Sequence, residues 1–343
     1  MTIPSLTDLH GRLGRCFVTG GGGFLGTEIV RQLREAGCEV TSGSRRRYPH
    51  VEALGAASVV LDVRDAAAVR AALEGHTTVF HTAAIPGAFG PRELFWSANV
   101  DGTQNVLDAC KAIGVSRLIH TSSPSVVFDG HDHREATAAS TDYPERFLSP
   151  YPESKAEAER RVLAERELPV VALRPHLIVG PGDPNLLPRL IARARQRRLA
   201  VVGHGTNRVS LSDVRNAASA HLQAASTLAP GAPHQGRAYF VNQRESVVLW
   251  DWIATILDAA GAPRPARRVS PGTAYRIGAV LESAWKLLRL GGEPPMTRFI
   301  AQQLALDHTY SLAEAERDFG YVERWSLQEC TASIVAALEQ PAG

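Results

Sequence analysis

The stretch TGGGGFLG, from Thr19 to Gly26, decides how this 343-residue chain folds. A short apolar run at 15–19 leads into it, and 27–36 follows with apolar side chains at helical spacing. Glycines alone also suit a flexible loop. Between a strand and a helix, however, they let the backbone approach a pyrophosphate, which the free N–H groups at the helix start can bind. We therefore expect this turn to bind a dinucleotide through Gly20, Gly23, Phe24, Leu25 and Gly26.

Strand and helix patterns keep alternating outward from this turn. Further strands are expected at 39–42, 58–61, 78–81, 117–121 and 170–173, and helices at 69–73, 100–113 and 154–167. This alternation predicts the α/β class, with a Rossmann-type, doubly wound parallel sheet. After Arg174 the pattern loosens into Pro- and Gly-rich turns. That change predicts a smaller mixed, mainly helical C-terminal substrate lobe over the ligand-binding edge of the sheet.

The same patterns suggest limits for the domains. We expect an N-terminal extension over 1–13 and a dinucleotide-binding domain over 14–174. The chain is expected to return to that domain at about 206–245, where 239–242 looks like one more strand. The substrate lobe would then consist of 175–205 and 246–343.

The end of the second strand indicates which nicotinamide cofactor is used. NAD sites usually carry an acidic residue there to bind the ribose 2′-hydroxyl. Here Ser44 stands in that place, and Arg45 and Arg46 follow. An arginine offers a fork of donors to a 2′-phosphate, which a carboxylate would repel. We therefore favour NADP(H), with Arg45 as the leading contact; the alternative is a solvated basic loop that binds nothing.

Two further strand ends carry weaker signals for the cofactor. Asp62 and Val63 follow the third strand and are placed to meet the adenine ring. Ala83 and Ala84 follow the fourth strand, where small side chains leave room for the cofactor to pass the backbone.

The sequence YPESK, with Tyr151 and Lys155 four residues apart, supplies candidate catalytic groups. This spacing places both side chains on one face of a helix. A ketone that is reduced must receive a proton, and a nearby ammonium lowers the pKa of a tyrosine that donates or accepts it. Ser123 ends the fifth strand and can bind the substrate oxygen, whereas Ser122 should point to the other side. Two exposed residues on an amphipathic helix would be the ordinary alternative.

Composition excludes several other classes. The formal net charge is only +2, so no overall field favours nucleic acid. The four cysteines form no CxxC pair, and we expect neither a metal site nor a disulfide framework. The N-terminus does not read as a signal peptide, and no apolar run has the roughly 20 residues that a membrane span needs. We expect a cytoplasmic protein.

Seven motifs along the chain resemble those of the extended short-chain dehydrogenases/reductases. They are TGGGGFLG (19–26), DV (62–63), HTAA (81–84), NVDGT (99–103), TSSPSV (121–126), YPESK (151–155) and LRPHLIVGPGD (173–183). TSSPSV resembles the 3β-hydroxysteroid dehydrogenase branch more than the sugar epimerases. The second half, including TAYRIGAVLESAWKLLRL (273–290), is similar to the 2-alkyl-3-oxoalkanoate reductases of bacterial long-chain olefin synthesis.

The resemblance implies a substrate and roles for several residues. That family reduces a long-chain 2-alkyl-3-oxoalkanoic acid to the 3-hydroxy acid with NADPH, on the way to a β-lactone. Ser123, Tyr151 and Lys155 carry over as the catalytic triad, and Pro175 as a neighbour of the nicotinamide. Asn99 and Asp213 carry over as structural residues; His176 faces either the nicotinamide or the protein interior. The resemblance also implies a homodimer and assembly with other pathway enzymes.

Two other functions remain open at this point. The same chemistry would serve a 3β-hydroxysteroid or 4-carboxysterol 3-dehydrogenase, the latter decarboxylating. A non-catalytic cofactor-binding scaffold in a multienzyme complex is the third possibility, although a scaffold has no need of Ser123, Tyr151 and Lys155.

The C-terminal stretch at 273–290 has apolar residues at helical spacing, interrupted by Arg276, Lys286 and Arg289. It is expected to be either a core-facing helix of the lobe or the wall of an alkyl-chain tunnel. A third possibility is a helix for peripheral contact with a membrane or a partner.

Overall fold

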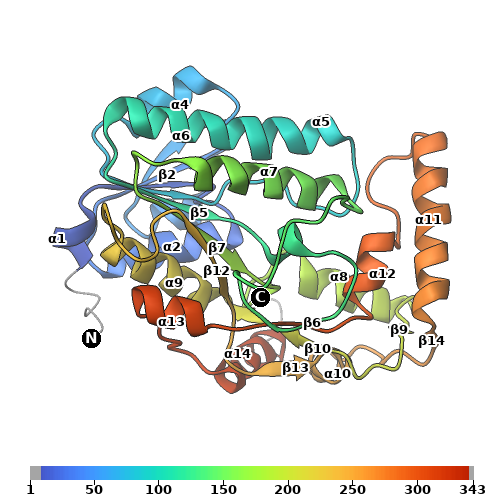
Figure 1. Ribbon diagram of the computed structural model, residues 1–343. Helices are drawn as coiled ribbons and strands as arrows, with labels where there is room; N and C mark the ends of the chain where they lie inside the picture. The colour runs from blue at the N-terminus through green and yellow to red at the C-terminus, as the bar shows by residue number, and fades with distance from the viewer. Residues whose placement is uncertain (1–8, 340–343) are drawn as a thin grey trace.

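A seven-stranded parallel sheet forms the centre of the computed structural model, which describes residues 9–339 (Figure 1). The strand order is β12-β7-β5-β4-β1-β2-β3, so the order reverses between β1 and β4. Ligands of open α/β sheets bind at such a reversal, outside the carboxyl ends of the strands. The strands are β1 Cys16–Thr19, β2 Val40–Ser44, β3 Ala57–Val60, β4 Thr78–His81, β5 Arg117–Thr121, β7 Val170–Pro175 and β12 Arg237–Val241.

Helices cover both faces of this sheet because successive side chains of its buried strands point to opposite sides. Phe17 packs with the helices of one face, and its neighbours Cys16 and Val18 pack with those of the other. The first face carries α4 Ala66–Leu73, α6 Gly102–Ile113 and α7 Pro150–Ala164, and the second α1 Leu9–Leu13, α2 Phe24–Glu35 and α9 Val214–Thr227. The predicted α/β fold, with helices on both faces of a parallel sheet, is confirmed.

The lobe contains more sheet than the sequence indicated. Four short strands pair in the order β13-β10-β15-β6 and come from distant parts of the chain. They are β6 His133–Ala136, β10 Arg208–Ser210, β13 Ser246–Val248 and β15 His308–Tyr310. Two smaller pairs are β8 Ile178–Val179 with β11 Ser212–Asp213, and β9 Val201–Val202 with β14 Arg268–Val269.

Helices make up the rest of the lobe and pack around a second apolar core. They are α8 Leu186–Arg195, α10 Leu249–Ala259, α11 Pro271–Leu287, α12 Arg298–Gln303 and α14 Leu327–Glu339. Helix α13 Ala313–Phe319 instead packs on the core of the main sheet, beside β12 and α9. Two short helices of the first half are α3 Pro49–Glu52 and α5 Arg92–Phe95. Among residues 9–339, no helix combines the length and the apolar character needed to cross a bilayer.

The part of the N-terminal extension that the structure describes is packed against the sheet domain. Leu9 and Leu13 of α1 are buried in the core beside α2 and α9. The hydroxyl of Thr78 donates to the carbonyl oxygen of Leu13 over 2.7 Å. The remainder of the expected extension, 1–8, lies outside the described residues.

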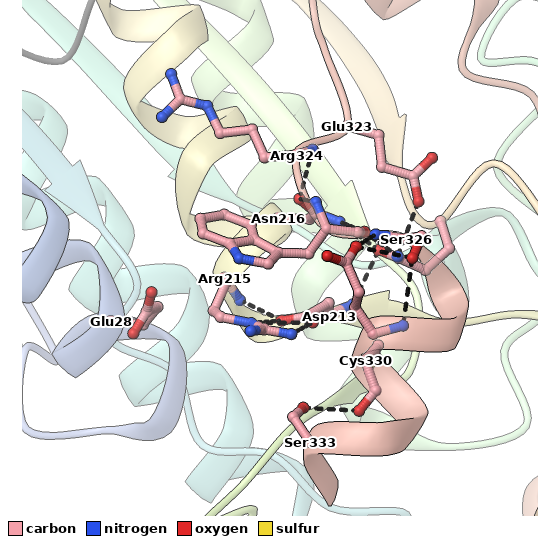
Figure 2. Close-up of polar contacts among 12 residues, drawn as sticks. Glu28, Asp213, Arg215, Asn216, Glu323, Arg324, Ser326, Cys330 and Ser333 are labelled. Carbon is pink, nitrogen blue, oxygen red and sulfur yellow. Dashed lines mark hydrogen bonds and ion pairs between the residues drawn. The ribbon is translucent and has the colours of Figure 1, made fainter.

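A polar cluster fastens the last helix to α9, as Figure 2 shows. Arg215 pairs with the buried carboxylate of Asp213 at 2.5 Å, and its guanidinium lies 5.1 Å from the ring centroid of Trp325. The side-chain oxygen of Asn216 accepts from the backbone N–H groups of Arg324 at 3.0 Å and Trp325 at 3.1 Å. The start of α9 is thereby bonded to the segment that leads into α14.

Candidate active site

The glycine turn closes tightly between β1 and α2. Gly20 has a φ of 69°, and a Cβ atom built on it would lie 2.9 Å from the backbone of Ala83. A Cβ atom on Gly26 would lie 2.2 Å from the carbonyl oxygen of Gly20. Side chains are therefore excluded at both positions, and the N-terminus of α2 lies directly against the turn. This arrangement fits a pyrophosphate bound by backbone N–H groups.

Two adjoining cavities open at the carboxyl ends of the central strands, and both are lined by Gly20, Gly23, Thr82 and Ala84. The first, of about 190 Å³, extends to the ends of β2 and β3. The second, of about 420 Å³, extends to the start of α7. Of the predicted site residues, the first is also lined by Ser44, Arg45, Asp62, Val63 and Ala83. The second is also lined by Phe24, Leu25, Gly26, Ser123, Tyr151, Lys155 and Pro175.

The part of the first cavity at the end of β2, the strand-two corner, carries arginine side chains. The hydroxyl of Ser44 accepts from the backbone N–H of Gly22 at 3.0 Å, so this side chain supports the glycine turn. Arg45 is exposed at the cavity wall. Arg46 instead lies over the ring of Tyr48, 4.9 Å from its centroid, and is not among the residues that line either cavity. Of the two predicted arginines, the structure therefore brings only Arg45 to the cavity.

Arg64 is a second arginine of this corner, and the sequence interpretation missed it. It lines the first cavity and pairs with Asp62 through its guanidinium at 2.5 Å. Hydrogen bonds from Arg64, together with the charge of Arg45, lower the pKa of the Asp62 carboxyl to about 2. The available signal was a basic residue two positions after the aspartate that ends the third strand.

Tyr151 lies in the first turn of α7, which begins at Pro150, earlier than predicted. The hydroxyl of Ser149 caps the helix and accepts from the backbone N–H of Tyr151 at 3.4 Å. Burial raises the pKa of the Tyr151 phenol, and a hydrogen bond with Ser123 opposes that rise. Ser123 itself ends the segment after β5 and accepts from the hydroxyl of Ser125 at 2.9 Å. The structure thus brings Ser123 and Tyr151 together.

Lys155 is buried one turn further along α7. Its Nζ atom donates to the carbonyl oxygen of Thr121 over 2.7 Å and lies 3.4 Å from Nε2 of His120. Burial lowers the pKa of Lys155 to about 8, and the charge of Glu159 opposes this shift. The expected lowering of the Tyr151 pKa by the ammonium is not observed, because Lys155 is turned toward the end of β5 and burial outweighs the other influences on the phenol.

A buried ion pair joins β7 to α7, the helix that carries Tyr151 and Lys155. Arg174 of β7 donates to Glu159 of α7 through Nη2 at 2.6 Å and Nε at 3.0 Å. The hydroxyl of Tyr143 donates to the same carboxylate at 2.6 Å. Burial raises the pKa of Glu159, but Arg174, Ser122 and Tyr143 outweigh that effect and lower it. Ser122 therefore lies near Glu159, although it also lines the second cavity together with Ser123.

Three other residues singled out in the sequence have structural contacts. Asn99 lies in a π-helical turn over Trp96–Asp101; its Oδ1 accepts from the N–H of Ile85 at 2.7 Å, and its Nδ2 donates to the hydroxyl of Ser154 at 3.0 Å. His176 is buried, with Nδ1 2.6 Å from the carbonyl oxygen of Ser210, and does not line either cavity. Asp213 caps α9 by accepting from the N–H of Arg215 at 2.8 Å.

The arrangement can position a carbonyl group for proton transfer. A neutral phenol, a serine hydroxyl and a lysine lie in one cavity beside a glycine turn that suits a dinucleotide. The apolar part of the lining comes from Phe24, Leu25, Pro86, Pro175, Leu177, Ile178 and Leu186. Of these, Phe24, Leu25 and Pro175 were predicted from the sequence. Pro86 follows β4, and Leu177, Ile178 and Leu186 follow β7; sequence periodicity did not assign these four to the site.

Comparison with known proteins agrees with this geometry. The 3-beta hydroxysteroid dehydrogenase/isomerase family matches residues 17–271. Two relatives, from Stenotrophomonas maltophilia and Shewanella oneidensis, carry the name 2-alkyl-3-oxoalkanoate reductase. The first is 47% identical over 92% of this chain and 96% of its own, and the second 41% identical over 97% and 89%.

Among solved structures, MoeE5 in complex with UDP-glucuronic acid and NAD has a TM-score of 0.71 and 26% identity, covering 94% of this chain and 98% of its own. The fold, the family match and the relatives lead to one assignment. The chain belongs to the 3-beta hydroxysteroid dehydrogenase/isomerase family and is an oxidoreductase of the extended short-chain dehydrogenase/reductase type, acting on hydroxyl and keto groups.

Proposed function

We propose that this protein reduces the ketone of a long-chain 2-alkyl-3-oxoalkanoic acid to the 2-alkyl-3-hydroxyalkanoic acid, with NADPH as reductant. The observation that carries the proposal is the single cavity that holds Ser123, Tyr151 and Lys155 opposite the glycine turn. Residues 14–174 and about 206–245 would bind the cofactor, and 175–205 and 246–343 the substrate. The names of the two relatives support the substrate class and its place in long-chain olefin and β-lactone synthesis.

A nicotinamide dinucleotide fits both cavities. The pyrophosphate would lie at Gly20, Gly23 and Gly26, and the nicotinamide near Pro175. NAD bound to MoeE5 supports the cofactor class. Arg45 and Arg64 at the strand-two corner, with Ser44 in place of an acidic residue, favour the 2′-phosphate of NADP(H).

The side chains supply the proton that ketone reduction requires. NADPH, held at Gly20, Gly23 and Gly26 and near Pro175, would supply the hydride to the carbonyl carbon. Ser123 donates a hydrogen bond to the carbonyl oxygen, and Tyr151 transfers its phenolic proton to that oxygen as negative charge develops on it. Because burial raises the pKa of Tyr151, the phenol is protonated at neutral pH, which is the form that reduction needs. Lys155 places a positive charge in the same cavity.

The test follows the reaction in reverse through the absorbance of the reduced nicotinamide. The purified chain is mixed with NADP⁺ or NAD⁺ and either a long-chain 2-alkyl-3-hydroxy acid or a 3β-hydroxysterol acid. We expect NADPH to form from the alkyl acid. Replacing Tyr151→Phe should lower turnover by about 10²–10⁴-fold, the usual contribution of a general acid or base, while NADPH still binds.

Each alternative has its own result in this assay. Tyr275→Phe, on α11, is the matched control and should retain turnover. Activity only with the sterol acid and NAD⁺ would replace the proposal by the steroid dehydrogenase, which the family match alone would equally support. Cofactor binding without turnover of either substrate would favour the non-catalytic scaffold.

A further inference from the structure

Helix α11 carries most of the exposed apolar side chains of the described chain. Seven large apolar side chains are exposed among residues 9–339, and five of them belong to α11 or the residues just after it: Ile277, Val280, Leu287, Leu288 and Leu290. The exposed fractions of Val280 and Leu287 are 68% and 83%. Figure 1 shows α11 standing at the outer edge of the molecule. The core-facing interpretation of this stretch is therefore wrong for these residues.

The opposite face of α11 fixes this orientation. A Cβ atom on Gly278 would lie 2.6 Å from the backbone nitrogen of Arg298, so α11 approaches α12 as closely as a glycine permits. Glu282 is buried and pairs with the guanidinium of Arg298 at 2.8 Å. The carboxylate also accepts from the backbone N–H of Arg298 at 2.7 Å. With this face bonded to α12, the apolar stripe is directed outward.

Cations surround the stripe. Between Arg267 and Gly292 the chain has a single carboxylate, Glu282, which is already paired with Arg298. Five cationic residues occupy the same stretch and are exposed: Arg267, Arg268, Arg276, Lys286 and Arg289. Exposed apolar side chains flanked by cations are the chemical signature of a helix that lies in the headgroup region of an anionic bilayer.

We propose that this α11 surface, formed by Ile277, Val280, Leu287, Leu288 and Leu290 with Arg276, Lys286 and Arg289, docks on an anionic lipid surface. A second copy of the chain is a poorer occupant. A two-fold symmetric contact would place the same patch against itself, and so bring these three cations against their equivalents. An anionic headgroup layer pairs with the cations while its acyl boundary accepts the apolar side chains.

The α11 surface is also connected to the wall of the active site. Glu293 follows it and accepts from Arg189 at 2.9 Å and from the backbone N–H of Ala88 at 2.8 Å. The carbonyl oxygen of Ala88 accepts from the hydroxyl of Ser149, at 2.8 Å, and Ser149 caps the helix of Tyr151. Docking would therefore bring the substrate cavity near the lipid, where a long-chain substrate partitions; only this last step rests on the proposed function.

Vesicle co-sedimentation of the full chain tests the docking directly. Wild-type protein is mixed with phosphatidylcholine vesicles with or without phosphatidylglycerol. We expect binding to the vesicles that contain phosphatidylglycerol, and a fall of at least about tenfold in the partition coefficient of Val280→Asp/Leu287→Asp. Val60→Asp is the matched control, because Val60 is 64% exposed but lies on β3 of the main sheet. It should bind as wild type does.

Further measurements separate the competing occupants. Neutralising Arg276, Lys286 and Arg289 to Gln should lower binding by about fivefold per charge removed. No binding of wild-type protein to anionic vesicles, or equal binding by the Asp variant, would overturn the proposal. The proposal would also be overturned if sedimentation velocity showed that the wild-type protein is a dimer and that the Val280→Asp/Leu287→Asp variant is a monomer. Cofactor binding by each variant shows that it is folded, and turnover of a short, soluble β-keto ester reports on the active site independently of docking.

Discussion

Tyr151 and Lys155 lie four residues apart in α7, and burial shifts the pKa of each in the direction that favours its uncharged form. The pKa of the phenol is raised, whereas the pKa of the ammonium is lowered to about 8. At neutral pH the phenol is therefore protonated and the lysine still largely charged. A protonated phenol is the form that can donate a proton to the oxygen of a ketone during reduction.

The proposed preference for NADP(H) depends most on Arg45, which lies at the wall of the first cavity. Replacing Arg45→Gln removes a charged donor from the strand-two corner. Because a hydrogen bond to a charged group contributes about 1.5–3 kcal/mol, we expect the KM for NADPH to rise by roughly 10–100-fold and the KM for NADH to stay unchanged. Initial-rate kinetics with both cofactors measure this difference.

The neighbouring arginines provide the controls for that experiment. Arg46 lies over Tyr48, and Arg47 is exposed and 3.8 Å from Glu52. The variants Arg46→Gln and Arg47→Gln should therefore change the KM for NADPH much less. An Arg45→Gln variant that weakens NADH and NADPH equally would contradict a 2′-phosphate contact and point to a general loss of positive charge.

At the level of elements, the catalytic helix depends on its bond to β7. Glu159 is the carboxylate that opposes the lowering of the Lys155 pKa, and it is also the partner of the buried Arg174. The same side chain therefore holds α7 against the sheet and favours the charged form of Lys155. Stability and pH dependence should consequently change together when it is replaced.

Replacing Glu159→Gln tests this coupling. The free energy of unfolding should fall by about 3–5 kcal/mol, because Arg174 is left buried without a counter-ion. The pKa of Lys155 should fall below about 8, so that the loss of kcat/KM with rising pH begins at lower pH than in wild type. Chemical denaturation and a pH–rate profile measure the two effects.

Glu157→Gln is the matched control, since Glu157 lies on the same helix but pairs with Arg161 at the surface. It should leave both the stability and the pH profile close to wild type. A Glu159→Gln variant that is destabilised but keeps the wild-type alkaline limb would show that Glu159 only supports the fold.

For the molecule as a whole, the sequence predicted the sheet domain far better than the lobe. The strand at 78–81 was predicted with the observed bounds because its apolar run is short and clearly bounded. Helix α7 begins at Pro150, ahead of the predicted 154, because Ser149 caps it and proline is tolerated at the first helical position. The lobe strands β10, β13 and β15 have three residues each, too few to show a period.

Some residues of the candidate site could be predicted from the sequence and others could not. Its glycine turn and the pair Tyr151 and Lys155 could be found because their spacing follows from the chemistry. Arg64 left only the weak signal of a basic residue two positions after Asp62. Glu159 left none, because its role depends on a tertiary contact with Arg174 of β7. The sequence could not distinguish Arg45 from its neighbour Arg46. The difference arises because the Arg46 side chain packs over the ring of Tyr48, whereas Arg45 lines the cavity.

The attachment of the C-terminal segment to the sheet domain depends on Asn216, which is buried in the cluster of Figure 2. Its amide group donates to Gln243 at 2.7 Å and to the carbonyl oxygen of Trp325 at 2.6 Å, besides accepting two backbone N–H groups. Asn216→Ala leaves these partners unsatisfied and should cost about 2–4 kcal/mol of stability. Hydrogen exchange should accelerate in α14 before it does in the central strands. Gln104→Ala, whose side chain bonds only Asp108 at the surface, is the control; equal exchange of α14 in both variants would show that apolar packing alone holds the helix.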